Sequence, residues 1–375
     1  MEELYWLWLM AKGVSRGRCA RLLEQCGGSA QGVFELSGNE IAQCAYLTDA
    51  DMAALSDKSL DGLQEHLDLL SRNGVRLVHM GGPGYPELLY NIAKPPLLLY
   101  CRGKFIDLNE RLCVAMVGAR KCTDYGRSAA SHLAEGIAAG GALVVSGMAA
   151  GIDSAAHEGA LRAGGETVAV LGCGVNLVYP PSNAGLMRRI LQNGMVMSEY
   201  PIGAEPLPHH FPERNRIIAG ISRGVVVVEG SIKSGSLITA SLAQEQGKDV
   251  FAVPGNINSA LSKGPNYLLR DGAYVVTCAD DVLDQYRDAY IGTAPDNRAD
   301  LADTTDMALP PEEDSGTAAG RILGALTDVP VHIDELSAKT GLTVPELNAE
   351  LLLLEVAGRV ASHPGSCYSL PFSTR

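Results

Sequence analysis

The sequence predicts an α/β protein built around a doubly wound, mostly parallel sheet, with a small helical domain before it and a winged-helix domain after it. Three observations carry this prediction. Short apolar runs recur from residue 75 onward, helical patterns separate most of these runs, and glycine-rich loops follow several of them. Runs that are apolar at every position are typical of strands buried on both faces, and their alternation with helices favours parallel pairing.

Residues 1–70 predict the small helical domain. Glycines separate its helical patterns, which cover 3–11, 16–26, 29–36, 40–43 and 49–70. The turn from Gly13 to Gly17, between the first two patterns, could hold a phosphate on exposed backbone N–H groups. The same turn could equally serve only to connect two helices.

The predicted sheet domain covers residues 71–285. Its apolar runs are 75–79, 97–100, 113–117, 142–145, 167–171, 195–197, 225–228, 249–253 and 273–276. Helical patterns lie between most of them, at 125–139, 154–163, 182–192, 214–221 and 237–246. In doubly wound sheets ligands bind beyond the carboxyl ends of the strands. The candidate binding loops are therefore those that follow Val117, Val145, Leu171 and Val228.

Residues 286–317 predict an acidic, flexible linker, because they are rich in Asp, Glu and Pro and contain few large apolar residues. In residues 318–375, helical patterns at 321–326, 333–339 and 345–356 precede a strand–turn–strand at 359–369, the order of a winged helix. The presumptive recognition helix, 345–356, contains three Glu and no Lys or Arg. Such a helix is unsuited to a DNA major groove, so we expect this domain to bind protein.

The formal net charge of −13 is unevenly distributed along the 375 residues. Residues 101–275 carry 16 Lys and Arg against 14 Asp and Glu, whereas residues 276–375 carry 6 against 17. A near-neutral region can still present a basic cleft if its cations cluster, while the acidic last hundred residues repel polyanions. An anionic ligand is therefore expected in the middle region.

The composition also bears on the location of the protein and on metals. No stretch reaches the roughly 18 uninterrupted apolar residues of a membrane-spanning helix, and Glu2 and Glu3 stand where a signal peptide would carry Lys or Arg. We therefore expect a cytoplasmic protein without membrane insertion. Nine cysteines without a CxxC pair disfavour both a disulfide framework and a thiolate zinc site. No metal and no cofactor is expected.

Two of the candidate loops combine glycine with the start of a helix. Gly118, Arg120 and Lys121 place two cations near a helix N-terminus, which favours anions. Ser146 and Gly147 open the next helix, in which Asp153 and His157 are four residues apart. That pair could act in acid–base or metal chemistry, but a helix-capping Asp153 and a packed His157 explain the spacing as well.

Two further segments could bind phosphates and bases. In the segment 211–216, Phe211 offers a stacking face, and Arg216, more than Arg214, is expected to contact a phosphate. The loop after Val228 supplies Lys233, Ser234, Gly235 and Ser236. Its spacing is not that of a P-loop, so it predicts an anion cradle without ATP hydrolysis.

The loop after Leu171 disfavours two other chemistries. Leu177 stands where a Rossmann fingerprint needs glycine, which makes nicotinamide binding improbable. Cys173 could act as a nucleophile only with a base nearby; otherwise it is a small residue in a tight loop.

Several of these segments together resemble the DNA-processing protein A family, also called Smf. The resemblance rests on 116–120, 146–153, Ala156-His157, 211–220, 234–239 and 253–255, with Tyr85-Pro86, Pro95-Pro96 and Gly103 upstream. It implies an extended Rossmann-like domain, preceded by a helical domain of SAM-like type and followed by a winged helix. It also implies a homodimer that is no enzyme, binds single-stranded DNA and helps load RecA recombinase in natural transformation.

The DNA site that the resemblance implies consists of loop residues that the physical argument also selects. These residues are Gly118, Arg120, Lys121, Ser146, Gly147, Phe211, Arg214, Arg216, Lys233, Ser234, Gly235 and Ser236, with Lys263 and Asn266 as weaker additions. Two positions depart from the family pattern, because Ala150 and Pro208 stand where many relatives carry a basic residue. We therefore expect somewhat weakened binding that Ala150→Arg should strengthen.

Two alternatives use the same loops. One is a nucleotide hydrolase in which Asp153, His157 or Glu229 supplies acid–base chemistry, and the other is a nucleotide-sensing module that signals through the winged helix. The length of the preferred ligand distinguishes these two alternatives from a recombination mediator that binds single-stranded DNA. A recombination mediator should prefer oligonucleotides to mononucleotides, whereas a hydrolase should release a free base or phosphate.

Overall fold

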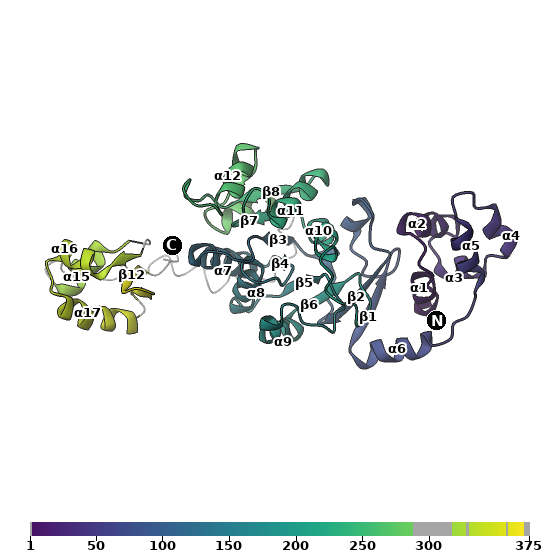
Figure 1. Cartoon of the computed structure of the whole chain (residues 1–375), viewed down its shortest axis with the longest axis horizontal. Helices are drawn as coiled ribbons and strands as arrows, with labels where there is room; N and C mark the ends of the chain where they lie inside the picture. The colour runs from purple at the N-terminus through teal and green to yellow at the C-terminus, as the bar shows by residue number, and fades with distance from the viewer. Residues whose placement is uncertain (1, 288–316, 328–329, 358, 371–375) are drawn as a thin grey trace. The chain divides into compact units, whose positions relative to one another are not determined.

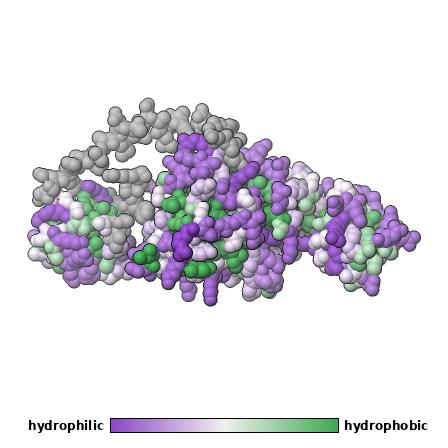
Figure 2. Space-filling view, turned by 90° about the horizontal axis from the view of Figure 1, so that it is seen from above, coloured by the Kyte–Doolittle hydropathy of each residue, from purple (hydrophilic) through white to green (hydrophobic). Residues whose placement is uncertain are grey.

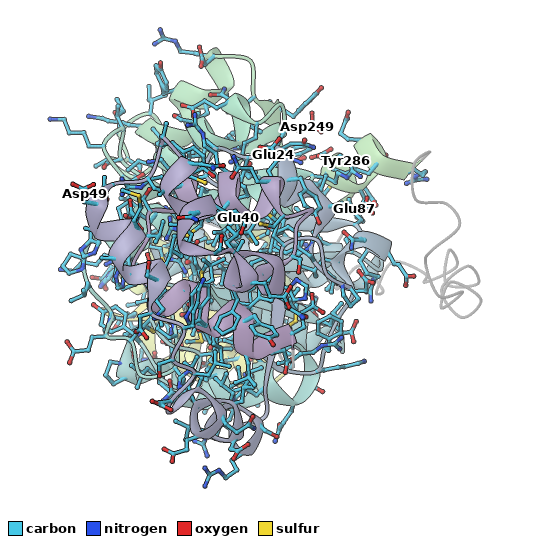
Figure 3. The ribbon with its side chains drawn as sticks, turned by 90° about the vertical axis from the view of Figure 1, so that its right-hand side faces the viewer. Glu24, Glu40, Asp49, Glu87, Asp249 and Tyr286 are labelled. Carbon is cyan, nitrogen blue, oxygen red and sulfur yellow. The ribbon has the colours of Figure 1, made fainter. Side chains whose placement is uncertain are left out.

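The computed structural model describes residues 2–287, 317–327, 330–357 and 359–370 (Figure 1). The chain forms two compact units, Met1–Pro295 and Asp296–Arg375. The predicted linker, 286–317, lies almost entirely outside the described residues. Its first residue, Tyr286, is buried, and its hydroxyl donates a 2.7 Å hydrogen bond to Asp249. Figure 3 labels both residues, close to each other in that view.

The first unit begins with six helices: α1 (Glu2–Ala11), α2 (Arg16–Gln25), α3 (Ala30–Glu35), α4 (Gly38–Gln43), α5 (Asp49–Ser56) and α6 (Leu63–Arg72). The prediction of one helix over 49–70 is wrong, because a turn separates α5 from α6. Asp57 follows α5, and its carboxylate accepts the N–H of Ser59. Gly62, with a left-handed φ of 74°, then starts α6. Aspartate and glycine are residues that favour turns over a continuous helix.

Each of the nine predicted apolar runs overlaps one strand of a single nine-stranded sheet. The strands are β1 (Val75–His79), β2 (Leu98–Gly103), β3 (Cys113–Val117), β4 (Leu143–Ser146), β5 (Thr167–Leu171), β6 (Met195–Ser198), β7 (Gly224–Val227), β8 (Asp249–Ala252) and β9 (Tyr274–Val275). Their order is β1-β2-β6-β5-β4-β3-β7-β8-β9. Strand β2 is antiparallel to β1 and to β6, and all other pairs are parallel.

Helices cover both faces of this sheet (Figure 1). One face packs against α7 (Asp124–Ala139), α8 (Ile152–Arg162) and α9 (Ala184–Asn193), and the other against α10 (His210–Ile221), α11 (Gly235–Glu245) and α12 (Lys263–Arg270). In β3, Ala115 and Val117 belong to the core beneath α10 and α11, and Val114 and Met116 to the core beneath α7 and α8. This two-sided burial explains the uninterrupted apolar runs.

Short elements complete the first unit: η1 (Glu87–Asn91), η2 (Leu108–Glu110), η3 (Pro181–Asn183), α13 (Asp280–Leu283) and η4 (Asp284–Tyr286). The N-terminal helices share one hydrophobic core with the sheet, because Trp6 and Trp8 belong to the same buried cluster as Leu77 of β1, Tyr100 of β2 and Ile190 of α9. The helical segment is therefore fixed to the β1–β2 edge of the sheet.

The strand order places a topological switch point between β3 and β7. From β3 the chain proceeds outward through β4, β5 and β6, and then returns to the other side of β3 as β7. The loops after β3 and β7 therefore lead to helices on opposite faces of the sheet, which opens a crevice at the carboxyl ends of the strands. Sequence periodicity predicts the strands, but only the strand order in the structure shows where this crevice lies.

The second unit has the predicted winged-helix elements: α15 (Ala318–Ala325), α16 (Ile333–Thr340), α17 (Val344–Val356) and the wing strands β11 (Ala361–His363) and β12 (Cys367–Ser369). The sequence does not predict a further strand, β10 (Val331–His332), which pairs with β12. Its core consists mainly of aliphatic residues such as Ile322, Leu336, Leu347 and Leu351. Figure 2 shows hydrophobic side chains at the surface of this unit, bordered by hydrophilic ones.

Within the part of the chain that the structure describes, no helix combines the length and the apolar character needed to cross a membrane.

Candidate functional site

A cavity of about 410 Å³ lies at the switch point, between the loops after β3 and β7. The structure brings many of the predicted site residues together in its lining: Gly118, Arg120, Lys121, Phe211, Arg214, Ser234, Gly235 and Ser236. These residues come from the loop after β3, from the first turns of α10 and from the start of α11. The cavity therefore combines segments that are more than 100 residues apart in the sequence.

The outer part of the cavity is cationic and aromatic. Arg120 and Lys121 are exposed, and the guanidinium carbon of Arg120 lies 5.1 Å from the centre of the Phe211 ring. On the same ring, Tyr179 makes a second aromatic contact, with ring centroids 5.3 Å apart. The Phe211 ring thus contacts Arg120 and the Tyr179 ring. Arg120 and Lys121 are exposed and therefore accessible to an anion.

The start of α11 provides a further anion-attracting wall. Ser234 is the residue before the helix, and its hydroxyl lies 2.6 Å from that of Ser236 instead of capping the helix. The N–H groups of the first turn lack partners within the helix, and the helix dipole adds positive charge there. A Cβ at Gly230 would approach both serine hydroxyls to 2.6 Å, which explains why glycine precedes this loop. Lys233 is exposed but does not line the cavity.

Arg214 forms the inner wall and is only 4% exposed. Its Nη1 donates to the carbonyl oxygens of Gly147, at 2.8 Å, and of Val170. A Cβ at Gly147 would lie 2.3 Å from the same nitrogen, so Gly147 is glycine because the guanidinium packs on it. Burial lowers the pKa of Arg214, and the negative charge of Asp153 opposes that shift.

Asp153 lines the cavity beside Arg214 and holds the loop before α8. Its carboxylate accepts the N–H of Gly147 at 3.2 Å and of Ala149 at 3.4 Å. Helix capping is wrong for this residue, because Gly151 occupies the N-cap position and Asp153 lies inside the helix. Burial raises the pKa of Asp153, whereas Arg214 and the two N–H groups lower it.

His157, four residues after Asp153 in α8, is fully buried. The hydroxyl of Thr167 donates to Val144, so it must accept its 2.7 Å hydrogen bond from Nδ1 of His157. Among the described residues Nε2 has no partner. Burial, aided by the charge of Arg214, lowers the pKa of His157 to about 3. The imidazole is therefore neutral and packed, as the non-catalytic interpretation predicts.

The buried neutral His157 makes stability pH-dependent. Its pKa rises to about 6.5 in the unfolded chain, so below that pH unfolding takes up a proton and the folded state loses stability. We expect the free energy of unfolding to fall by about 2 kcal/mol more between pH 7.5 and pH 5 than it does in His157→Gln. Urea unfolding at both pH values measures this difference. Equal pH dependence in the two proteins would contradict a neutral buried histidine.

Arg216 does not line the cavity, which reverses the expectation that it contacts a ligand more readily than Arg214 does. It is 7% exposed, and Nη2 forms a short ion pair with Glu199. Glu199 also pairs with Arg16 of α2 at 2.8 Å. The arginine thus faces away from the cavity and connects α10 to the N-terminal helices.

The turn at residues 13–17 does not present free cations to a phosphate. Arg16 pairs with Glu199, and Arg18 pairs with Asp51 at 3.2 Å. Figure 3 shows Glu24, Glu40 and Asp49 on the end of these helices that faces the viewer. The two interpretations of the turn, a phosphate held on its backbone N–H groups or a plain connection between two helices, both stay predictions.

Other predicted site residues serve the fold around the cavity. The hydroxyl of Ser146 is buried and donates to Met116 at 2.6 Å. The amide of Asn266 bonds the backbone of Gly255 at both its N–H and its carbonyl, and Lys263 is exposed at the start of α12, outside the cavity. Gly118 does line the cavity, but a Cβ there would also meet Ile152 at 2.5 Å.

The remaining candidates for catalysis also have structural roles. The carboxylate of Glu229 is buried and accepts both the N–H of Thr123 at 2.9 Å and its hydroxyl at 2.6 Å. Cys173 is buried, and burial raises the pKa of its thiol. Within the described ranges, no three His, Cys, Asp or Glu side chains come together as metal ligands.

Sequence reasoning missed several residues around the cavity. Tyr179 contacts Phe211, and Asn215, Ile238, Thr239 and Leu261 line the wall. Isoleucine 238 is 46% exposed although it is apolar. The residue types of Asn215, Ile238, Thr239 and Leu261 do not by themselves indicate ligand binding. Of the missed residues, only Tyr179, an aromatic residue in a loop after a strand, could have been chosen from the sequence as a candidate site residue.

The comparisons with known proteins agree with this architecture. A family model described as DNA recombination-mediator protein A matches residues 76–287, and a DprA winged helix domain model matches 306–366. The chain belongs to the DNA recombination-mediator protein A family. This confirms the resemblance seen in the sequence and the predicted fold, and it assigns the chain a role in DNA processing.

Relatives of the family cover almost all of the chain. Protein Smf of Synechocystis sp. is 36% identical over 98% of this chain and 98% of its own length. The structure of DprA from Streptococcus pneumoniae has a TM-score of 0.68 and 36% identity, and the match covers 75% of this chain and 97% of that one. A Helicobacter pylori DprA structure, described by its single-stranded DNA binding mode, has a TM-score of 0.53 and 32% identity over 59% of this chain and 99% of that one.

Proposed function

We propose that this protein binds single-stranded DNA in the switch-point cavity and acts as a recombination mediator. The observation that carries the proposal is the combination of Arg120, Lys121 and Phe211 at one opening, opposite the start of α11. Arginine and lysine pair with phosphates, the helix start attracts anions, and an aromatic face stacks a base. The Helicobacter pylori relative, whose structure concerns single-stranded DNA binding, supports the same ligand.

The finer parts of the proposal come from the family resemblance. They are homodimerisation through the Rossmann-like domain, transfer of the bound strand to RecA during natural transformation, action in the cytoplasm, and a binding role without catalysis. The site agrees with the last part, because Asp153, His157 and Glu229 hold loops or pack in the core. The hydrolase alternative therefore lacks an observation that favours it, whereas the nucleotide-sensing alternative is to be distinguished by the length of the preferred ligand.

The salt dependence of binding tests the proposal. Arg120 and Lys121 at the cavity and Lys233 beside it are exposed cations, and each phosphate contact on a single strand contributes about 0.7 to the slope of log affinity against log salt. Fluorescence anisotropy with a labelled (dT)20 strand should therefore give a slope near −2. A slope near zero, or no binding at low salt, would contradict the proposal.

Ala150 is exposed and follows Ala149, which lines the cavity. An arginine at position 150 could therefore reach a phosphate at the cavity, and we expect Ala150→Arg to bind (dT)20 more tightly than the unaltered protein.

We also propose that the winged-helix unit binds protein and not duplex DNA. On α17, Leu352 and Leu353 are 61% and 64% exposed, and Glu346 and Glu355 are exposed on the same helix. The phosphates that flank a major groove repel these carboxylates, and α17 has no Lys or Arg to contact those phosphates.

The fragment 318–375 should accordingly show no binding to duplex DNA in an electrophoretic mobility assay at physiological salt. The charge-altered fragment Glu350→Lys/Glu355→Lys, in which two acidic positions become basic and the capping box of Thr343 and Glu346 stays intact, should gain non-specific binding. Duplex binding by the unaltered fragment would exclude the proposal.

A further inference from the structure

We propose that Tyr179 is a second base-stacking residue of the single-strand site, next to Phe211; this inference rests on the proposed function. Tyr179 lies in the loop between β5 and η3, at the carboxyl end of the sheet; it does not line the cavity itself but lies beside Phe211, which does. Its ring contacts that of Phe211, with centroids 5.3 Å apart and planes at 38°. It remains 38% exposed, so part of the ring is open to a ligand.

The fold holds this ring in place before any ligand arrives. Leu177 and Val178, just before it, pack against the core that includes α9. After it, the side-chain amide of Asn183 donates to the carbonyl of Met148 at 2.8 Å and to Ser154 at 2.9 Å. When the backbone on both sides of a residue is already held in place, binding a ligand orders little additional chain. The entropic cost of binding is then small, which favours affinity.

No interaction within the described part of the chain explains why a tyrosine stands here. Its hydroxyl makes no hydrogen bond to any described residue, the residue is 38% exposed, and its ring contacts that of Phe211. Tyrosine is enriched at binding interfaces, because its ring offers a large apolar surface and its hydroxyl a polar end. Base stacking is already proposed for the neighbouring Phe211, over which Arg120 lies. An exposed ring beside Phe211 can therefore take part in the same interaction.

Together these three side chains form a series that suits a strand with unpaired bases. Arg120 lies over Phe211, and Phe211 lies beside Tyr179. A nucleobase on the open part of Tyr179 would extend the stack by one position, while Arg120 and Lys121 contact phosphates. Stacking of this kind tolerates every base, since every base has a π face. A duplex keeps its bases paired and cannot use the ring.

The test compares a strand with bases and a strand without them, using the full chain. Anisotropy is measured with (dT)20 and with an abasic 20-mer of tetrahydrofuran units. Tyr179→Ala should weaken binding of (dT)20 about ten-fold and leave the affinity for the abasic strand unchanged. Tyr179→Phe should bind (dT)20 as the unaltered protein does, because it keeps the stacking face.

Tyr274→Ala provides a matched control. Tyr274 is 46% exposed and its ring also lies 5.3 Å from that of a phenylalanine, Phe251, but it belongs to β9, and Phe251, unlike Phe211, does not line the cavity. This variant should bind (dT)20 normally. A second comparison separates stacking from support of Phe211, because Tyr179→Ala/Phe211→Ala should bind more weakly than Phe211→Ala alone.

The outcomes distinguish this inference from the function on which it rests. If the unaltered protein does not bind (dT)20, the proposed function fails. If it binds and Tyr179→Ala binds equally well, or loses affinity equally for both strands, only the role of Tyr179 is overturned. The inference is also overturned if the double variant binds no more weakly than Phe211→Ala, because Tyr179 would then only support that ring.

Discussion

Arg214→Ala should lower the free energy of unfolding by about 3 kcal/mol. The guanidinium is buried and donates to the carbonyls of Gly147 and Val170, and its charge compensates that of buried Asp153. Removing it leaves two carbonyls without a donor and one carboxylate without a compensating charge, and each of these is costly in the interior. Urea unfolding followed by circular dichroism measures the loss.

Two controls show whether the loss has this cause. Arg162→Ala removes a half-exposed arginine that pairs with Glu135 at the surface, and it should cost less than about 1 kcal/mol. In Arg214→Ala/Asp153→Asn the buried charge is also gone, so the double variant should be more stable than the sum of the two single losses predicts. An unchanged midpoint in Arg214→Ala would show instead that Arg214 serves the ligand alone.

Arg120→Ala/Lys121→Ala should weaken (dT)20 binding about 100-fold at low salt and make the salt slope shallower by about 1.4. Both side chains are exposed at the cavity and neither forms an ion pair with a described residue, so the change should leave the unfolding midpoint unaltered. Anisotropy across a salt series gives both quantities.

The matched control is Arg188→Ala/Arg189→Ala, which removes two exposed arginines of α9 that do not line the cavity. It lowers the net charge by the same amount. If both double variants weakened binding equally, the net charge of the protein and not the cavity would determine affinity, and the location of the site would be wrong.

The sequence predicted the sheet because most strands consist largely of apolar residues, and the central strand β3 is apolar throughout, so that each is recognisable without its neighbours. It also predicted the loops of the cavity, since Gly118, Phe211 and Ser234 all follow or precede recognisable elements. These predictions depend on local pattern, which a single sequence contains. The split between α5 and α6 was missed because Gly62 lies in a segment whose apolar spacing continues a helix.

The roles of the two arginines depended on information that the sequence does not contain. Arg214 and Arg216 are two residues apart and chemically identical, and only the positions of Gly147 and Glu199 decide which one faces the cavity. Those partners are 67 and 17 residues away. Tyr179 was missed for the same reason, because its contact with Phe211 exists only after β5 and α10 are packed on one sheet.

The central claim is that the cavity takes a strand of DNA and not a single small ligand. Competition against labelled (dT)20 at low salt, with unlabelled (dT)20, thymidine monophosphate and a 20-base-pair duplex, tests it most directly. The account predicts displacement by the unlabelled strand at concentrations at least a hundred-fold below those needed of the mononucleotide or the duplex. Equal displacement by the mononucleotide would contradict it and would assign the cavity to one small anionic ligand.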